Sequence, residues 1–220
     1  VTVKILKSPE VVKAALIGFP TIEDAGNCVA EIIAKGCIPA GCEIMDKALT
    51  KATNDYSKAG YPTDAEAIMI IEFDGTEHEV EAYIQKVKEI AEKNNSSSLK
   101  VNKSKEERLK FWAGRKAAFP ACGVLAPDYM CMDGSIPRGK LAEVLNEITR
   151  LSKKYNLPVA NAFHAGDGNL HPLIMFDAND KESLRKCEEF GADILKYCVK
   201  VGGALTGEHG VGIEKRELMC

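Results

Sequence analysis

The sequence contains no apolar run of the roughly 18–20 residues that span a bilayer. Its first residues lack a basic region followed by an apolar one, so we expect no signal peptide. The 29 Lys and Arg residues are scattered and slightly outnumbered by 32 Asp and Glu residues, which gives a net charge of -3. Nucleic-acid-binding proteins usually carry a basic stripe, and we therefore expect no nucleic-acid partner.

Two nucleotide-binding fingerprints are also missing from the sequence. It contains neither G-x-G-x-x-G nor G-x-x-x-x-G-K-[ST], so neither a dinucleotide-binding unit nor a P-loop is indicated. C-x-x-C is absent despite eight cysteines, which argues against cysteine-type zinc sites and thioredoxin-like chemistry. Most of these cysteines lie in apolar periodic segments. That placement favours small buried hydrophobes in a reducing cytoplasm.

Hydrophobic periodicity predicts that strands and helices alternate along the chain. Strands are expected at 11–19, 67–73, 99–101, 129–132, 158–164 and 170–176, and helices at 21–36, 46–58, 76–94, 104–120, 138–155 and 183–201. A tight glycine-rich turn joins the last two strands, which implies that they pair antiparallel. We therefore predict an α+β fold: an antiparallel sheet with helices on one face, built from two ferredoxin-like halves.

The ends of the sequence look like parts of interrupted elements. Residues 1–7 are expected to form a strand that is already under way at Val1, and residues 214–220 a helix that stops in mid-turn. These features suggest that residues 1–220 are one domain of a longer polypeptide.

Three of the four histidines fall in two glycine-rich stretches, HAGDGNLH (164–171) and GEHG (207–210). If His164 and His171 face each other across an antiparallel pair, their Cβ atoms lie about 4.5–5.5 Å apart. They could then share a metal ion, with Glu208 or His209 as a third ligand. Such a set leaves coordination positions open and is typical of catalytic sites. The alternative is that these histidines are hydrogen-bonded turn residues.

Arg115 follows Trp112 by three residues in an expected helix, so the two side chains share a face. A guanidinium beside a large apolar ring can hold a carboxylate through two parallel hydrogen bonds. A surface arginine that packs its stem on the ring is the alternative.

Four segments resemble the signatures of FAD-linked 2-hydroxy acid oxidases and dehydrogenases. They are NAFHAGDGNLHP (161–172), GGALTGEHGVGIEK (202–215), PDYMCMDGSIPR (127–138) and GYPTDAE (60–66). The likeness runs from near Pro9 to the end of the chain. It is strongest to the glycolate oxidase D subunits, with D-lactate and D-2-hydroxyglutarate dehydrogenases as further relatives.

This resemblance implies that residues 1–220 are the ferredoxin-like C-terminal (cap) domain of such a flavoprotein. The N-terminal FAD-binding domain and a final C-terminal segment would then lie outside the sequence. It also implies that His164, His171 and Glu208 bind a divalent metal such as Zn, Mn or Fe. His209 matches the family's proposed base, and Arg115, in W-x-x-R, matches the arginine that holds the substrate carboxylate.

The implied activity is hydride transfer from the α-carbon of a 2-hydroxy acid to FAD, which yields a 2-oxo acid. Cys131 stands where the D-2-hydroxyglutarate enzymes have a lysine for a second carboxylate. We therefore expect a small 2-hydroxy monocarboxylate, glycolate or D-lactate. The expected electron acceptor is an iron–sulfur subunit or an electron-transfer flavoprotein. The protein is expected in the cytoplasm, held at the inner face of the membrane by such partners, and it could form homo-oligomers.

Two other functions stay open on the residues alone. A metal-dependent hydrolase would use Glu208 or His209 to activate a zinc-bound water. A non-catalytic ferredoxin-like binding or oligomerisation module would need no converging ligands. In that module the side chains of His164, His171 and Glu208 would lie more than about 8 Å apart, too far to share an ion.

Overall fold

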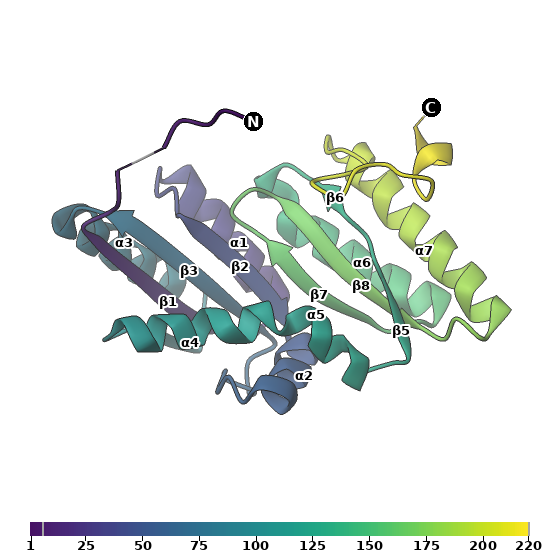
Figure 1. Ribbon diagram of the computed structural model, residues 1–220, viewed down its shortest axis with the longest axis horizontal. Coiled ribbons are helices and arrows are strands. Elements are labelled where there is room, and N and C mark those ends of the chain that lie inside the picture. Colours follow the sequence, from purple (N-terminus) through teal and green to yellow (C-terminus); the bar gives the residue numbers. More distant parts are fainter. Residues whose placement is uncertain (6, 220) are drawn as a thin grey trace.

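The computed structural model describes residues 1–5 and 7–219, and it shows one twisted sheet flanked by helices (Figure 1). The strands are β1 (Val11–Phe19), β2 (Gly41–Asp46), β3 (Ala67–Gly75), β4 (Ser98–Val101), β5 (Asp128–Cys131), β6 (Gly134–Ser135), β7 (Val159–His164) and β8 (Asn169–Phe176). The helices are α1 (Ile22–Ala34), α2 (Lys47–Ser57), α3 (Glu77–Lys93), α4 (Lys105–Lys116), α5 (Ala118–Ala121), α6 (Leu141–Tyr155) and α7 (Lys181–Lys200). None of these helices is long and apolar enough to cross a membrane.

The sheet is antiparallel, with the order β4-β1-β3-β2-β7-β8-β5 and with β6 also paired to β8. Its first half runs β1-α1-β2-α2-β3-α3-β4, which with the order β4-β1-β3-β2 is a ferredoxin-like unit with α2 added between β2 and β3. In the second half, β5 and β6 occupy the position that β1 has in the first half. A single bridge between Ser135 and Ala204 takes the place of the fourth strand. The two predicted ferredoxin-like halves are therefore present.

The two halves join edge to edge where β2 pairs with β7. Strand β2 was not predicted from the sequence. It follows Pro39 and contains Glu43 among apolar neighbours, so it shows neither alternation nor an uninterrupted apolar run. The strands predicted between residues 11 and 176 are all present, and so are the helices predicted between residues 21 and 201.

Helices cover both faces of the sheet. The four long helices α1, α3, α6 and α7 pack on one face over the larger core, in agreement with the prediction. The opposite face carries a second core under α2, α4 and α5 (Figure 1). This second layer forms because the central strand β3 is buried almost throughout, and a strand that is apolar on both sides needs cover on both.

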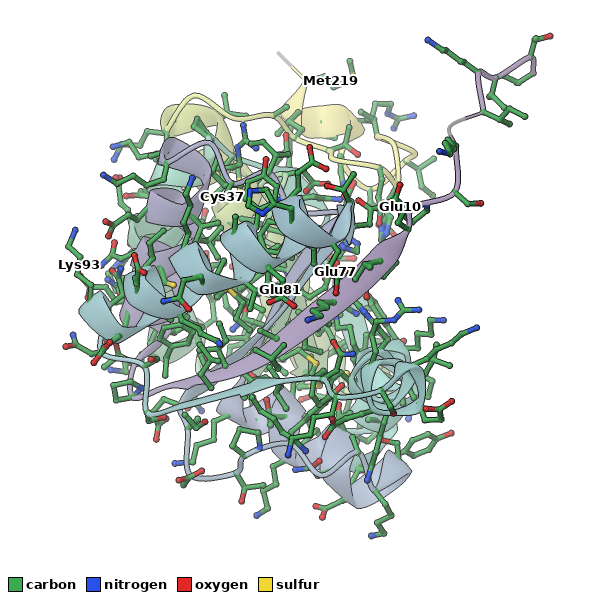
Figure 2. All side chains as sticks on the ribbon, turned by 90° about the vertical axis from the view of Figure 1, so that its left-hand side faces the viewer. Glu10, Cys37, Glu77, Glu81, Lys93 and Met219 are labelled. Atoms are coloured by element: carbon green, nitrogen blue, oxygen red, sulfur yellow. The ribbon has the colours of Figure 1, made fainter. Side chains whose placement is uncertain are left out.

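The described residues at the two ends depart from their predictions. Residues 1–5 and 7–9 form no strand, and the side chains of Val1 and Val3 are exposed. Figure 2 shows this segment before Glu10 leading away from the body of the protein, where no strand is available to pair with it. At the other end only Arg216–Leu218 forms a short turn of 3-10 helix. Leu6 and Cys220, which belong to these two predictions, lie outside the described residues.

Candidate functional site

The candidate site begins at the seam between the two halves. Antiparallel pairing of β2 with β7 sets Glu43 directly opposite His164. Because side chains alternate along a strand, both point to the face that carries α4 and α5. His171 on β8 points to the same face.

The structure corrects the predicted pairing of the two histidines. His164 pairs with Asn169, and His171 pairs with Ala162, so the histidines are diagonal neighbours rather than direct partners. Diagonal neighbours on one face are within reach of long or aromatic side chains. The two imidazole rings accordingly meet edge to face, with their centroids 5.0 Å apart.

A buried aspartate holds the loop that brings Glu208 and His209 to the strands. The carboxylate of Asp133 is fully buried and accepts hydrogen bonds from the backbone N–H groups of Gly207, Glu208 and His209 at 2.9–3.2 Å. The Thr206 hydroxyl donates to it at 2.6 Å. Burial alone would raise the pKa of Asp133, but these hydrogen bonds hold the pKa well below its usual range.

Lys215 completes this anchor from within the protein. Its side chain is 5% exposed, and Nζ donates to the backbone carbonyl of Asp133 at 2.6 Å. Nζ also lies 3.2 Å from Oδ2 of the same residue. The loop is therefore held by the buried Asp133–Lys215 ion pair, whose carboxylate also accepts hydrogen bonds from the loop.

Glu208 converges with all three histidines of the two signatures. Its Oε1 lies 3.0 Å from His171 Nε2, 3.6 Å from His164 Nε2 and 3.8 Å from His209 Nε2. Ligand atoms of His164, His171 and Glu208 all lie within 4.8 Å of one another. The separation of more than about 8 Å expected for a module without converging ligands is not found.

The chemistry of this donor set fits a divalent cation. His164 Nδ1 lies 2.7 Å from Glu43 Oε1, so in the neutral ring Nδ1 carries the proton and Nε2 turns its lone pair toward Glu208. Carboxylate and imidazole lone pairs that meet at one point repel unless a cation or shared protons lie between them. A histidine held by a carboxylate on its far nitrogen is also the usual support of a metal ligand.

Electrostatics differ between the two strand histidines. The hydrogen bond to Glu43 raises the pKa of His164 against the effect of burial. Burial lowers the pKa of His171, helped by the neighbouring His164. Its side chain is only 1% exposed, whereas that of His164 is 33% exposed and that of Glu208 is 54% exposed. The cluster thus has a buried back wall and an open front.

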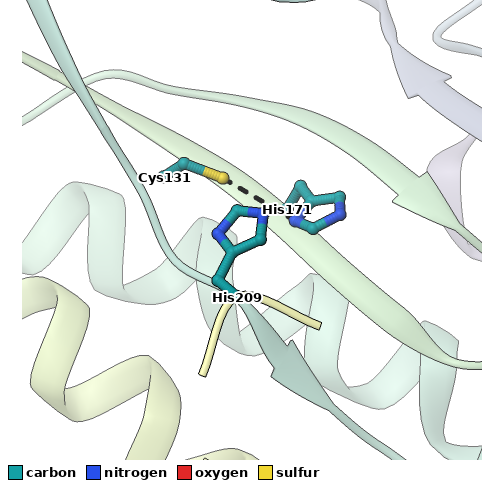
Figure 3. Close-up of side chains that lie close together, drawn as sticks. All are labelled: Cys131, His171 and His209. Carbon is teal, nitrogen blue, oxygen red and sulfur yellow. Dashed lines mark hydrogen bonds between the residues drawn. The ribbon is translucent and has the colours of Figure 1, made fainter. Parts of the chain in front are cut away.

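Cys131 lies beside His171, on the side of the ring away from Glu208. Its Sγ lies 3.7 Å from His171 Nδ1, and the ring of His209 stacks on that of His171 at 5.0 Å (Figure 3). Cys131, His171 and His209 form a second group with metal-ligand spacing. Burial raises the pKa of the Cys131 thiol to about 12, so it is a neutral thiol at neutral pH.

Arg115 reaches the cluster from α4 and is buried, which excludes the surface arginine of the alternative interpretation. Its Nε donates to Glu43 Oε2 at 3.1 Å, and Nη2 lies 3.0 Å from the same oxygen. Nη2 is nevertheless too poorly aligned to count as hydrogen-bonded. Trp112 on the same helix binds elsewhere: its Nε1 donates to Glu72 at 2.6 Å.

A cleft of about 510 Å³ opens in front of the cluster. Glu43, His164 and Glu208 line it together with Gly41 and the exposed Arg138. Two larger cavities, of about 640 and 680 Å³, lie beside α7 and beside α2 and contain none of the cluster residues. The smaller cleft therefore reaches the cluster at Glu43, His164 and Glu208, whereas Arg115, His171 and His209 do not line it.

Sequence reasoning missed three residues that build the site: Glu43, Asp133 and Lys215. Asp133 and Lys215 lie inside the signature segments, but no role was predicted for either. Glu43 lies in the strand that was not predicted. A carboxylate within the apolar stretch GCEIM was the available signal, because buried charges need partners.

Fold and site together define an α+β domain of two ferredoxin-like halves with a His/Glu cluster and a buried arginine at their seam. The family model described as "FAD linked oxidases, C-terminal domain" matches residues 8–220, and the chain belongs to this family.

Among curated proteins, the glycolate oxidase subunit GlcD of Escherichia coli K12 is 50% identical over the whole chain. The mitochondrial D-lactate dehydrogenase [cytochrome] of Arabidopsis thaliana is 31% identical over the same span. The chain covers 44% and 39% of these two relatives, so it spans less than half of their length.

A solved 4-ethylphenol oxidase from Gulosibacter chungangensis shares the fold, with a TM-score of 0.66 at 12% identity. That alignment covers 90% of this chain and 46% of the other.

Proposed function

We propose that this chain is the substrate-binding part of a flavin-dependent 2-hydroxy acid dehydrogenase that converts glycolate or D-lactate to the 2-oxo acid. The observation that carries the proposal is the convergence of Glu208 on His164, His171 and His209 beside the buried Arg115. The named relatives act on these two substrate classes, which supports the same choice here.

The proposed metal site consists of His164, His171 and Glu208 with a divalent ion such as Zn, Mn or Fe. When bound, the ion would lower the pKa of the substrate hydroxyl, and the flavin would accept the hydride. Arg115 would hold the substrate carboxylate with the guanidinium hydrogens that Glu43 leaves free.

His209 is the proposed base. Its backbone N–H is fixed by Asp133, and its side chain is 45% exposed while the ring stacks on His171, so the ring touches both the cluster and solvent. There it can accept the hydroxyl proton and pass it to solvent.

The wider setting of the proposal follows the family. FAD would be held mainly by an N-terminal domain outside this sequence, and a final C-terminal segment would complete the enzyme. Electrons would leave to an iron–sulfur subunit or an electron-transfer flavoprotein in the cytoplasm, at the inner face of the membrane. The thiol of Cys131 is neutral and offers no positive charge to a second substrate carboxylate, which supports a small monocarboxylate as the substrate.

The base assignment is tested in the full-length protein that carries this chain. We expect His209→Ala to slow anaerobic flavin reduction by D-lactate or glycolate by about 10²–10⁴-fold, the usual contribution of a general base. His78→Ala is the matched control, because His78 is an exposed histidine on α3. A normal reduction rate in His209→Ala would refute the assignment.

The metal is tested by elemental analysis of protein purified without chelators. We expect about one divalent ion per chain, and its loss in His171→Ala. Protein without a bound ion whose activity is indifferent to chelators would refute the metal site. Ester or amide hydrolysis by the 220-residue chain without flavin would instead favour a metal-dependent hydrolase.

A further inference from the structure

Glu43 is a buried carboxylate shared by two residues with different proposed tasks. It is 9% exposed, and each of its oxygens has a separate partner. Oε1 lies 2.7 Å from Nδ1 of His164, a proposed metal ligand. Oε2 accepts from Nε of Arg115, the proposed carboxylate anchor, at 3.1 Å.

The fold makes this sharing possible only at the seam between the halves. His164 is the last residue of β7 in the second half, whereas Glu43 belongs to β2, the edge strand of the first half. Arg115 comes from α4, which packs on the same face over the smaller core. A one-residue slip of β2 against β7 would turn Glu43 to the other face of the sheet and remove both contacts.

A carboxylate is the group that suits both partners. It has two equivalent acceptor oxygens and no proton, so it can accept from the imidazole and the guanidinium at once. An amide of the same shape has one acceptor and one donor. Glutamine at position 43 would therefore turn its NH₂ group toward either His164 Nδ1–H or Arg115 Nε–H, and two donors would face each other.

The charges at the site have a further consequence. Glu43 already neutralises the positive charge of Arg115, so a substrate carboxylate added beside this pair brings one uncompensated negative charge. A divalent ion at His164, His171 and Glu208 would offset that charge. By linkage, the carboxylate would strengthen ion binding by the same factor.

We propose that Glu43 is a positioning residue that couples the metal ligand His164 to the carboxylate anchor Arg115. Ion affinity and carboxylate affinity would then depend on the same side chain. The inference rests on the proposed function, because it takes its two sites from there, but it adds a residue and a coupling to them.

The test compares Glu43→Gln with Glu72→Gln. Glu72 is a matched control because it is a partly buried carboxylate on β3 that also binds α4, through Arg108 at 2.8 Å and Trp112 at 2.6 Å. Zn²⁺ affinity of the 220-residue chain is measured by competition with a chromophoric chelator. We expect affinity to fall about 10–100-fold in Glu43→Gln and to stay within about twofold in Glu72→Gln.

A second readout is the effect of glycolate on Zn²⁺ affinity. We expect glycolate to tighten Zn²⁺ binding in the wild type and in Glu72→Gln, and this effect to disappear in Glu43→Gln. In the full-length enzyme at saturating metal, Glu43→Gln should raise KM more than it lowers kcat. Glu43→Asp, which keeps the charge on a shorter stem, serves if the glutamine variant fails to fold.

The outcomes separate this inference from the proposed function. Wild-type protein that binds Zn²⁺ and a Glu43 variant that binds it equally well would overturn the coupling and leave the function standing. An equal loss in Glu72→Gln would also overturn it, because the loss would then come from α4 packing. Wild-type protein that binds no Zn²⁺ would overturn the metal part of the proposed function itself.

Discussion

Replacing Asp133 with asparagine is expected to weaken the fold and release the loop that carries Glu208 and His209. The substitution keeps the shape of the side chain but removes its charge. Lys215 would then keep only the backbone carbonyl of residue 133 as a partner for its buried Nζ. The loop N–H groups would share one amide oxygen in place of a carboxylate.

The size of the effect follows from what remains unpaired. Removing one partner of a buried ion pair costs about 3–5 kcal/mol, because the other charge stays buried. Lys215 Nζ keeps its hydrogen bond to the backbone carbonyl of residue 133, so we expect the free energy of unfolding to fall by about 3 kcal/mol. That is about a hundredfold in the folding equilibrium. Because the native pKa of Asp133 is lowered, this contribution is complete above about pH 4 and fades as the pH falls through the native pKa.

Urea denaturation at pH 7 measures this loss, and Zn²⁺ affinity reports the release of the loop. The double variant Asp133→Asn with Lys215→Met removes the stranded charge and should recover part of the lost stability. A loss below about 1 kcal/mol in Asp133→Asn, with unchanged Zn²⁺ affinity, would show that the anchor is not what holds the loop.

Two further predictions concern stability. Burial raises the pKa of Asp46 to about 6, so ionising Asp46 opposes folding, and wild-type stability relative to Asp46→Asn should fall by about 2 kcal/mol as the pH rises from 4 to 7. Urea titrations in which this difference stays flat or rises with pH would contradict the prediction. Gly203→Ala should cost about 1–3 kcal/mol in the same assay, because the added Cβ would lie 1.9 Å from the backbone oxygen of Ser135. Gly139→Ala, with open space around its Cβ, is the control, and an equal effect in both variants would contradict the steric argument.

Local patterns were enough to predict most elements of the fold. The helices predicted from residues 21, 76 and 104 each begin behind Thr21, Thr76 or Ser104, whose side chain accepts a backbone hydrogen bond from the first turn; such a cap is a local signal. Strand β3 was readable from its apolar run. Strand β2 was missed because its burial depends on the strands and helices around it.

The candidate site was predictable in part. His164, His171, Glu208 and His209 stand in two contiguous glycine-rich stretches, so their chemistry is visible without the fold. Asp133 and Glu43 hold these residues from positions far away in the chain. A hydrogen bond between distant residues leaves no local pattern.

The sequence by itself determined the alternation of elements, the antiparallel hairpin and the side chains available for a metal and a carboxylate. Only the tertiary structure decided that His164 and His171 meet diagonally, that both faces of the sheet are covered, and that Glu43 joins His164 to Arg115. The reason is physical: periodicity and capping act within a few residues, whereas register across the seam is set by the packing of both halves at once.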